Sequence, residues 1–326
     1  AFPLVTRLAT ESVGVLGRRL AAVYAANTLG TVVGSFTAGF VLIPLVGVRY
    51  ALAIGVALNL LVAVAYLLGA GRQQVRLAGL GGALAGVTVA GWLLLPDWNK
   101  AVLTSGAYLY ADYYARGDAL AMMENKKVLH YRDALTGTIS VVSAKMPDGK
   151  DLVSLQINGK TDASTGDLST QLLHAHLPAL LHPNPRSALV IGLASGCTLG
   201  ALTEYPELQR IDCVEIEPEM VRASAYFRDI NREGLRDPRV RLFIDDARSF
   251  VLVSKDRYDL ITSEPSNPWI AGTGNLFTRE YFRLIRDHLN ADGVFCQFLP
   301  LYNLAPNDLR SIIGTFTAVF PHCSLW

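Results

Sequence analysis

The sequence predicts an α/β fold in which transmembrane helices and a small β domain precede a doubly wound parallel sheet. Three observations predict it: long uncharged apolar stretches near the beginning, an alternating ribbon in the middle, and strand–helix alternation in the last part. We expect transmembrane helices in residues 1–96, a connector and a small β domain in 97–168, and the large sheet domain in 169–326.

Composition limits the classes of partner. The 326 residues hold 29 Lys and Arg and 28 Asp and Glu, so no basic excess indicates nucleic acid. The mean hydropathy of +0.30 is high for a soluble protein, and it is concentrated in the first hundred residues. The spacing of the four cysteines is not that of a metal site, and we expect reduced thiols and no metal. They are Cys197, Cys213, Cys296 and Cys323.

Three apolar stretches carry no charged side chain, and each is long enough to cross a hydrocarbon core of about 30 Å. They cover residues 24–46, 50–68 and 77–95. A helix that is apolar on every face belongs in lipid or in a large core. We therefore expect a multi-pass protein of the cell membrane with the lipid bilayer as a partner. Because Ala1 is not an initiator Met, we also expect membrane sequence upstream.

A ribbon of short strands is expected after a tyrosine-rich connector at 97–130. Residues 138–144 alternate, the turn Met146-Pro147-Asp148-Gly149 follows, and residues 152–157 lead into Asn158-Gly159. This pattern predicts a small antiparallel domain.

Strands and helices then alternate, which predicts a parallel sheet with helices on both faces, of the Rossmann type. Expected strands cover 188–192, 210–216, 240–244, 258–263 and 293–299, and expected helices cover 169–181, 195–205, 218–230 and 278–289. The last residues, 324–326, are also expected to be a strand. Ligands of such sheets bind at the carboxyl ends of the strands.

Three of these strand ends carry features of a nucleoside site. The small residues Gly192, Ser195 and Gly196 let a ligand approach the backbone, although such loops also serve tight packing. Glu215 ends the second strand, where an acid accepts ribose hydroxyls, whereas Glu217 suits a helix cap. Asp246 ends the third strand, and its carboxylate with the N–H of Ala247 suits adenine. The loop is not G-x-G-x-x-G, so a dinucleotide is not favoured.

The fourth strand ends in Ser263-Glu264-Pro265-Ser266-Asn267-Pro268-Trp269. Glu264 is the expected catalytic carboxylate, since it suits proton transfer from an attacking amine. Trp269 suits the wall of an apolar pocket. The alternative is a rigid structural turn. His174 and His176 are two residues apart on a predicted helix, which is poor metal spacing and favours core or surface roles.

At these residues the sequence resembles the spermidine synthase family, the polyamine aminopropyltransferases. The likeness runs over residues 130–326. Its marks are Asn158-Gly159, His182-Pro183-Asn184-Pro185, the Gly192–Gly196 loop, Val214-Glu215-Ile216-Glu217, Asp237-Pro238-Arg239-Val240, Asp246 and Asn275-Leu276-Phe277. Together with the Glu264 loop and Leu103-Thr104-Ser105-Gly106, the apolar spans resemble a branch fused to a multi-pass membrane domain.

The resemblance implies a small β domain before a Rossmann-like domain of the class I methyltransferase type. It implies a transferase that moves an aminopropyl group from decarboxylated S-adenosylmethionine to an amine, with no tightly bound cofactor. Carried over by position, Glu215 binds ribose, Asp246 reads adenine and Glu264 takes the place of the catalytic Asp. A homodimer is also an expectation. Because the cosubstrate is cytosolic, we expect a cytoplasmic catalytic domain, although counting Arg18, Arg19, Arg72 and Arg76 by the positive-inside rule places it outside.

The departures from the family lie in the amine half of the site. Ser195 stands where the family has an Asp that holds the aminopropyl ammonium, Asn267 replaces a diamine-binding Asp, and Asp162 replaces a Gln. We expect Asp162, Asn267, Trp269 and Tyr131 to bind the acceptor. Two alternatives stay open: a methyltransferase using intact S-adenosylmethionine, favoured by Ser195, and a membrane transporter or sensor that binds a nucleoside without chemistry.

Overall fold

The computed structural model describes residues 16–69, 75–94 and 97–326, and the chain divides into two compact units. The first unit holds the helices before Asn99 together with Asp133–Leu135, and the second holds Asn99–Arg132 and Thr136–Trp326. Both sheets lie in the second unit. The expected boundary at residue 168 stays a prediction.

The first unit is helical. Its elements are α2 (Leu16–Phe36), the π-helical η2 (Thr37–Leu42), α3 (Ile43–Gly69) and α4 (Val75–Leu94). Gly47, with φ 84°, breaks the helical backbone inside α3, a conformation that glycine adopts without steric cost. The next residue, Val48, donates its N–H to the Asp133 carboxylate at 2.9 Å.

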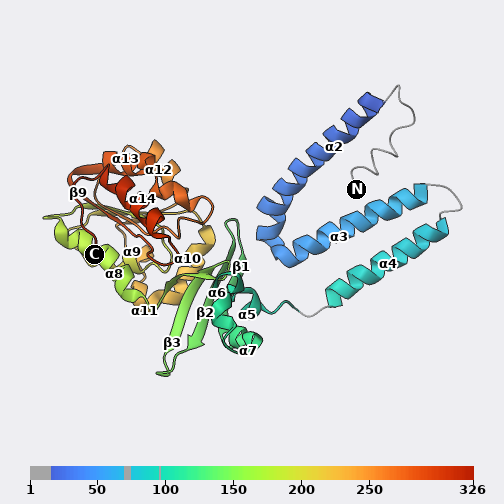
Figure 1. Cartoon of the computed structure of the whole chain (residues 1–326), viewed down its shortest axis with the longest axis horizontal. Coiled ribbons are helices and arrows are strands. Elements are labelled where there is room, and N and C mark those ends of the chain that lie inside the picture. Colours follow the sequence, from blue (N-terminus) through green and yellow to red (C-terminus); the bar gives the residue numbers. More distant parts are fainter. Residues whose placement is uncertain (1–15, 70–74, 95–96) are drawn as a thin grey trace. The chain divides into compact units, whose positions relative to one another are not determined.

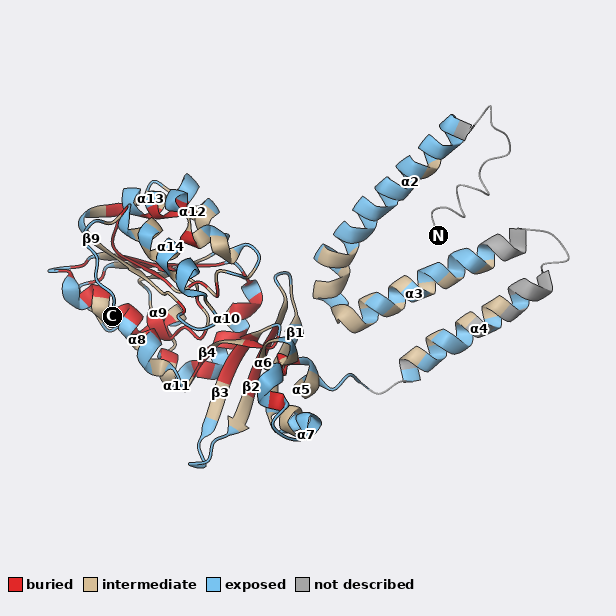
Figure 2. Ribbon diagram, viewed as in Figure 1, coloured by how far each residue is buried: buried red, intermediate tan, exposed pale blue. Residues whose placement is uncertain are grey.

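One helical run in the described residues, Gly17–Ala65, is long and apolar enough to cross a membrane. None of its most apolar window is buried within the protein, and large side chains such as Leu29 and Val62 are exposed. The apolar part of α4, Gly81–Trp92, is shorter. The described residues therefore hold one candidate membrane helix, where the sequence predicted three spans. Figure 2 shows the exposed surfaces of these helices.

Three short helices, α5 (Lys100–Leu103), α6 (Ala107–Tyr114) and α7 (Ala119–Glu124), occupy the expected connector. A four-stranded sheet follows, in the order β1 (Lys127–Asp133), β2 (Thr138–Lys145), β3 (Asp151–Ile157) and β4 (Lys160–Ser164). Strands β2, β3 and β4 pair antiparallel, as the ribbon predicted. Asn158 and Gly159 both have positive φ, so they form the two-residue turn between β3 and β4.

The large sheet is wholly parallel in the order β7-β6-β5-β8-β9. Its strands are β5 (Ser187–Ile191), β6 (Arg210–Glu215), β7 (Val240–Ile244), β8 (Tyr258–Ser263) and β9 (Leu289–Gln297). Its main helices are α8 (Leu168–Leu181), α9 (Cys197–Leu202), α10 (Pro218–Ser224), α12 (Ala247–Val253), α13 (Arg279–Asp287) and α14 (Pro306–Thr317). The domain built on this sheet also contains four short elements. They are α11 (Arg228–Asn231) and the 3-10 turns η3 (Ala225–Phe227), η4 (Gly234–Arg236) and η5 (Thr273–Phe277).

Helices cover both faces of this sheet, because an apolar core lies on each face. Along β5, Ala188 and Val190 pack in a core with residues of α8 and α9, whereas Leu189 and Ile191 pack in a core with α13. Successive strand side chains point to opposite faces, so a strand apolar at every position needs helices on both. Figures 1 and 2 show the buried strands between these helices.

Several sequence expectations need correction. The helix expected over 195–205 covers only Cys197–Leu202, because Ala194 and Gly196 have positive φ. The helix expected over 218–230 is divided into α10, η3 and α11. The last strand begins at Leu289 rather than 293, and residues 324–326 form no strand.

Candidate active site

The site begins at the glycine loop after β5. Gly192 has φ 92°, and a Cβ built there would lie 3.4 Å from the carbonyl oxygen of Glu264. The N–H of Glu264 in turn donates to the carbonyl of Ile191 at 3.1 Å. The carboxyl ends of β5 and β8 therefore bring the glycine loop and the Glu264 loop together, as parallel strand ends do.

Ser195 is buried in this loop, and its hydroxyl is hydrogen-bonded to the Gln171 side-chain carbonyl. The same hydroxyl accepts the N–H of Cys197 at 3.2 Å. Ser195 therefore holds α8 to the start of α9. Its expected contact with the cosubstrate stays a prediction, as do those of Gly192 and Gly196.

Glu215 ends β6 and is 6% exposed. Its two carboxylate oxygens accept the backbone N–H of Leu193 at 2.8 Å and of Glu217 at 2.9 Å. Burial raises the pKa of Glu215, and the backbone hydrogen bonds from Leu193, Glu217 and Ala194 oppose this rise. Glu215 thus fixes the glycine loop, and the roughly four lone-pair sites of its carboxylate exceed these three donors, which leaves capacity for a ribose hydroxyl.

Glu217 caps α10, as the sequence indicated, because its side chain accepts the N–H of Glu219 at 3.0 Å. It is not on the surface, however. It is 2% exposed, and its other oxygen accepts the N–H and the hydroxyl of Thr136.

Asp246 follows β7 and is exposed. Its carboxylate caps α12 by accepting the N–H of Ser249 at 2.8 Å, which accounts for an acid at this position without a ligand. Asp245 accepts the N–H of Asp246, and its own N–H donates to the Glu215 carbonyl. The reading of adenine by Asp246 and Ala247 stays a prediction.

Glu264 has the surroundings of a functional carboxyl group. Its side chain is 19% exposed, with Oε1 2.7 Å from the Thr198 hydroxyl and 3.6 Å from Nδ1 of His174. Burial raises the pKa of Glu264 to about 8. The Thr198 hydroxyl also lies 2.9 Å from the Gln171 carbonyl. The Thr198 hydroxyl donates its proton to that carbonyl or to Glu264, and its hydrogen bond to the Glu264 carboxylate opposes the rise in pKa.

His174 was not predicted to belong to the site. It is 8% exposed, and burial lowers its pKa to about 4, so the imidazole is neutral at pH 7. The Thr262 hydroxyl donates to the His174 carbonyl at 3.1 Å and lies 3.3 Å from Nδ1. Thr262 is therefore the acceptor for a proton on Nδ1. The period of α8, with its buried Gln171, His174 and Ala175, was the available signal.

The small sheet reaches the Glu264 loop through Asp162. Its Oδ1 lies 2.5 Å from the Ser266 hydroxyl and 2.6 Å from the ammonium of Lys160, a residue that the sequence did not single out. Asn267 is 1% exposed, and neither polar atom of its side chain has a hydrogen-bond partner.

The expected aromatic residues lie further out. Trp269 is 43% exposed, and its ring centre lies 6.5 Å from that of Tyr302. Tyr131 lies on β1, 5.4 Å below the ammonium of Lys100. Their binding roles stay predictions.

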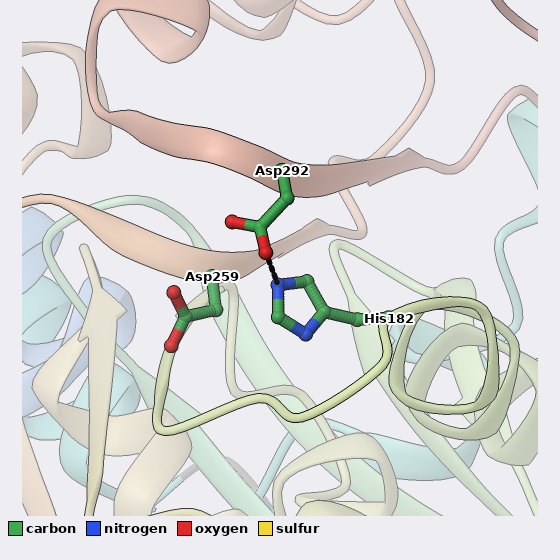
Figure 3. A group of neighbouring side chains, drawn as sticks. All are labelled: His182, Asp259 and Asp292. Carbon is green, nitrogen blue, oxygen red and sulfur yellow. Dashed lines mark ion pairs between the residues drawn. The ribbon is translucent and has the colours of Figure 1, made fainter.

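A different cluster lies at the opposite, amino end of the large sheet, where His182, Asp259 and Asp292 have ligand atoms within 4.8 Å of one another (Figure 3). His182 Nδ1 accepts the N–H of Asn184 at 3.2 Å, so Nε2 carries the proton and faces Asp292 at 3.5 Å. A metal ligand needs the reverse tautomer. Asp259 already accepts hydrogen bonds from Arg186, Ser187 and Asn290, which hold the strand starts. The cluster is structural.

The five-stranded parallel sheet defines a Rossmann-like α/β domain, and sheets of this type generally bind ligands at the carboxyl edge, where Glu215 and Glu264 lie. Residues 169–326 match the family model of the spermine/spermidine synthase domain. The C-terminal part of this chain therefore carries a spermine/spermidine synthase domain.

Known relatives agree with this assignment. A polyamine aminopropyltransferase from Lachnoclostridium phytofermentans is 34% identical over 148 residues, which are 45% of this chain and 52% of the relative. The spermidine synthase of Dictyostelium discoideum is 30% identical over 175 residues, 53% of this chain and 60% of the relative. A crystal structure of spermidine synthase in complex with the transition-state analogue AdoDATO has a TM-score of 0.54 at 26% identity, covering 60% of this chain and 66% of that one. The chain thus spans little more than half the length of these curated relatives.

Proposed function

We propose that the protein is a membrane-anchored aminopropyltransferase of the spermidine synthase type. It moves the aminopropyl group of decarboxylated S-adenosylmethionine to a small-molecule amine, with no tightly bound cofactor. The observation that carries the proposal is Glu264, a partly buried carboxyl with a raised pKa at the carboxyl end of β8, beside the glycine loop of a spermine/spermidine synthase domain.

In the proposed reaction, the lone pair of the acceptor amine attacks the methylene carbon bonded to the sulfonium. The C–S bond breaks, and its electron pair returns to sulfur, so methylthioadenosine leaves. The amine nitrogen loses one proton, and Glu264 accepts it. Glu215 holds the ribose, and Asp246 with the N–H of Ala247 holds adenine.

The raised pKa of Glu264 fits this role only with the donor bound. At a pKa of about 8 the carboxyl is mostly neutral at pH 7 in the free protein. A sulfonium cation beside it favours the ionised form and lowers the pKa. Binding of the donor therefore converts Glu264 into a base, as general-base catalysis requires.

The membrane part of the proposal rests on the first unit. The helical run Gly17–Ala65, which is charged only at Arg18, Arg19 and Arg49, exposes its apolar side chains, which lipid covers at no cost. We propose that it anchors the protein as part of a multi-pass segment, with the catalytic domain in the cytoplasm, where the nucleoside cosubstrate is found.

A donor assay tests the proposal. The purified full chain is incubated with decarboxylated or intact S-adenosylmethionine and a panel of amines, and the nucleoside product is identified. Methylthioadenosine from the decarboxylated donor supports aminopropyl transfer. Adenosylhomocysteine from the intact donor would instead establish a methyltransferase, an outcome that the neutral Ser195 hydroxyl favours. Tight nucleoside binding with neither product would establish a binding protein.

A further inference from the structure

A buried ammonium lies beside the loop that carries Glu264. Lys160 is 4% exposed, and its Nζ lies 2.6 Å from Asp162 Oδ1, 3.1 Å from the Ser266 hydroxyl and 3.4 Å from the Thr161 carbonyl. Lysine is almost never buried without a partner. Three acceptors match its three protons, so the ammonium is fully satisfied where it lies.

The Lys160–Asp162 ion pair changes the net charge of the acceptor side, which is the part of the site where the acceptor amine is proposed to bind. A second ammonium on a bound diamine needs an anion when it leaves water. Apart from Glu264 on the loop itself, the acid in contact with Ser266 is Asp162, and Lys160 already neutralises its charge through Oδ1, while Oδ2 is buried without a hydrogen-bond partner. Asn267, which follows Ser266 and is also buried, is a neutral amide.

Asn267 has hydrogen-bonding capacity to spare. Both its Oδ1 and its Nδ2 are buried without a partner, whereas buried polar groups are almost always paired. An amide both donates and accepts, so it pairs with a hydroxyl or a carboxylate as well as with an amine. It supplies no charge to compensate a buried cation.

We propose that the acceptor is a monoamine whose far polar group carries no positive charge, such as an amino alcohol or an amino acid, rather than a diamine. The inference rests on the proposed aminopropyl transfer and specifies its acceptor. Asn267 hydrogen-bonds the far polar group, and the Lys160–Asp162 pair keeps the acceptor side electrically neutral. The single amine reaches Glu264 and is the nucleophile.

An isosteric series tests the inference, because only the far group changes. Methylthioadenosine formation by the full chain is measured with 4-amino-1-butanol, 4-aminobutanoate and 1,4-diaminobutane. We expect kcat/KM for the better of the two monoamines to exceed that for the diamine by tenfold or more. The alcohol and the acid distinguish an uncharged from an anionic far group. A higher kcat/KM for the diamine would overturn the inference and leave aminopropyl transfer intact.

Two substitutions test the residues themselves. Asn267→Asp adds one carboxylate in nearly the same volume and should shift the kcat/KM ratio at least tenfold toward the diamine. Lys160→Met removes the cation that neutralises Asp162 and should shift the ratio in the same direction, with melting temperature measured to count folded protein. Asn307→Asp, on the exposed start of α14, is the matched control and should leave the ratio unchanged.

The outcomes separate the two proposals. A monoamine preference that neither substitution moves would overturn the assignment of Asn267 and Lys160. An absence of methylthioadenosine with every acceptor would overturn aminopropyl transfer, and this inference with it.

Discussion

At the scale of single residues, Glu264 is a carboxyl group whose surroundings favour its neutral form. Its pKa rises from the usual value of 4.5 to about 8, chiefly through burial. A raised carboxyl pKa contributes stability that is complete below the unfolded value and is lost as the pH rises through the folded value. The ionised carboxylate therefore costs folding free energy above pH 8, by up to about 5 kcal/mol at 1.36 kcal/mol per unit.

We predict that Glu264→Gln raises the stability of the free protein at pH 9 and changes it little at pH 4.5. The amide keeps the shape of the neutral acid but never ionises. Urea unfolding at the two pH values measures the difference. Glu207→Gln, at an exposed site, is the control and should show no such pH dependence. An equal effect of Glu264→Gln at both pH values would contradict the raised pKa.

Glu215 gives a second prediction at this scale. Glu215→Ala removes the proposed ribose contact and should weaken methylthioadenosine binding by about 1.5–3 kcal/mol, the range for hydrogen bonds to a charged group. Isothermal calorimetry measures this loss. Asp245→Ala, which changes an exposed acid at the neighbouring strand end, should leave the affinity nearly unchanged. If instead Asp245→Ala weakens binding and Glu215→Ala does not, the ribose assignment fails.

The sequence predicted some site residues and missed others for one physical reason. Glu215 and Glu264 end buried strands, and the ends of parallel strands meet at one edge wherever they lie in the chain. His174 and Lys160 reach the Glu264 loop from a helix and from the small sheet, and nothing local in the sequence marks that approach. Convergence of this kind depends on how elements pack.

At the scale of elements, buried strands were the most predictable feature, because a run of four or five apolar residues has few other uses. Short helices were the least predictable. The seven residues of α12 make about two turns, too few for a helical period to stand out from a window of about 11 residues. The expected helix start at 195 failed because the positive φ of Gly196 delays it.

The β3–β4 turn sets where Lys160 and Asp162 lie, and it depends on a close backbone approach. A Cβ on Gly159 would lie 2.5 Å from the backbone N of Gly106 and 2.8 Å from its Cα. We predict that Gly159→Ala destabilises the protein by about 1–3 kcal/mol or more, through both the clash and the positive φ.

Gly149→Ala is the matched control for that substitution. Gly149 has nearly the same φ, 82° against 79°, but nothing lies within 4 Å of its added Cβ. In thermal unfolding, Gly149→Ala should lower the free energy of unfolding only by the backbone strain, which is about 1 kcal/mol. Equal melting temperatures for the two variants would contradict the close approach.

At the scale of the whole molecule, hydropathy predicted three spans, and the part of the chain that the structure describes has one helical run that satisfies both length and composition. The first expected span, 24–46, falls within this run, and the second, 50–68, extends three residues beyond it. Gly47 is the only residue with a non-helical backbone in α3. The third expected span, 77–95, overlaps α4, and residues 95–96 lie outside the described part. Gly47 lies in the short interval, 47–49, that separates the first two expected spans, so the break in hydropathy coincides with the break in the helical backbone.

We predict that the full chain stays in the membrane fraction after an alkaline carbonate wash and is released by detergent. The run carries charge only at Arg18, Arg19 and Arg49, so its long apolar stretches have no favourable way to leave the hydrocarbon core. Placing Arg at both Leu29 and Leu58, each well exposed on the run, should reduce the retained fraction severalfold. Arg at exposed Leu120 on α7 is the control. Release of the unaltered protein by carbonate alone would contradict anchoring.

The most direct test of the proposed function measures methylthioadenosine formation by Glu264→Gln, per mole of folded protein, at saturating donor and amine. The substitution keeps the shape of the neutral carboxyl and removes its capacity to accept the amine proton. We predict that turnover falls by about 10²–10⁴, the usual range for loss of a general base, while methylthioadenosine affinity stays within about twofold of the unaltered protein. Full turnover in a stably folded Glu264→Gln protein would show that Glu264 only braces its loop, and would contradict the mechanism.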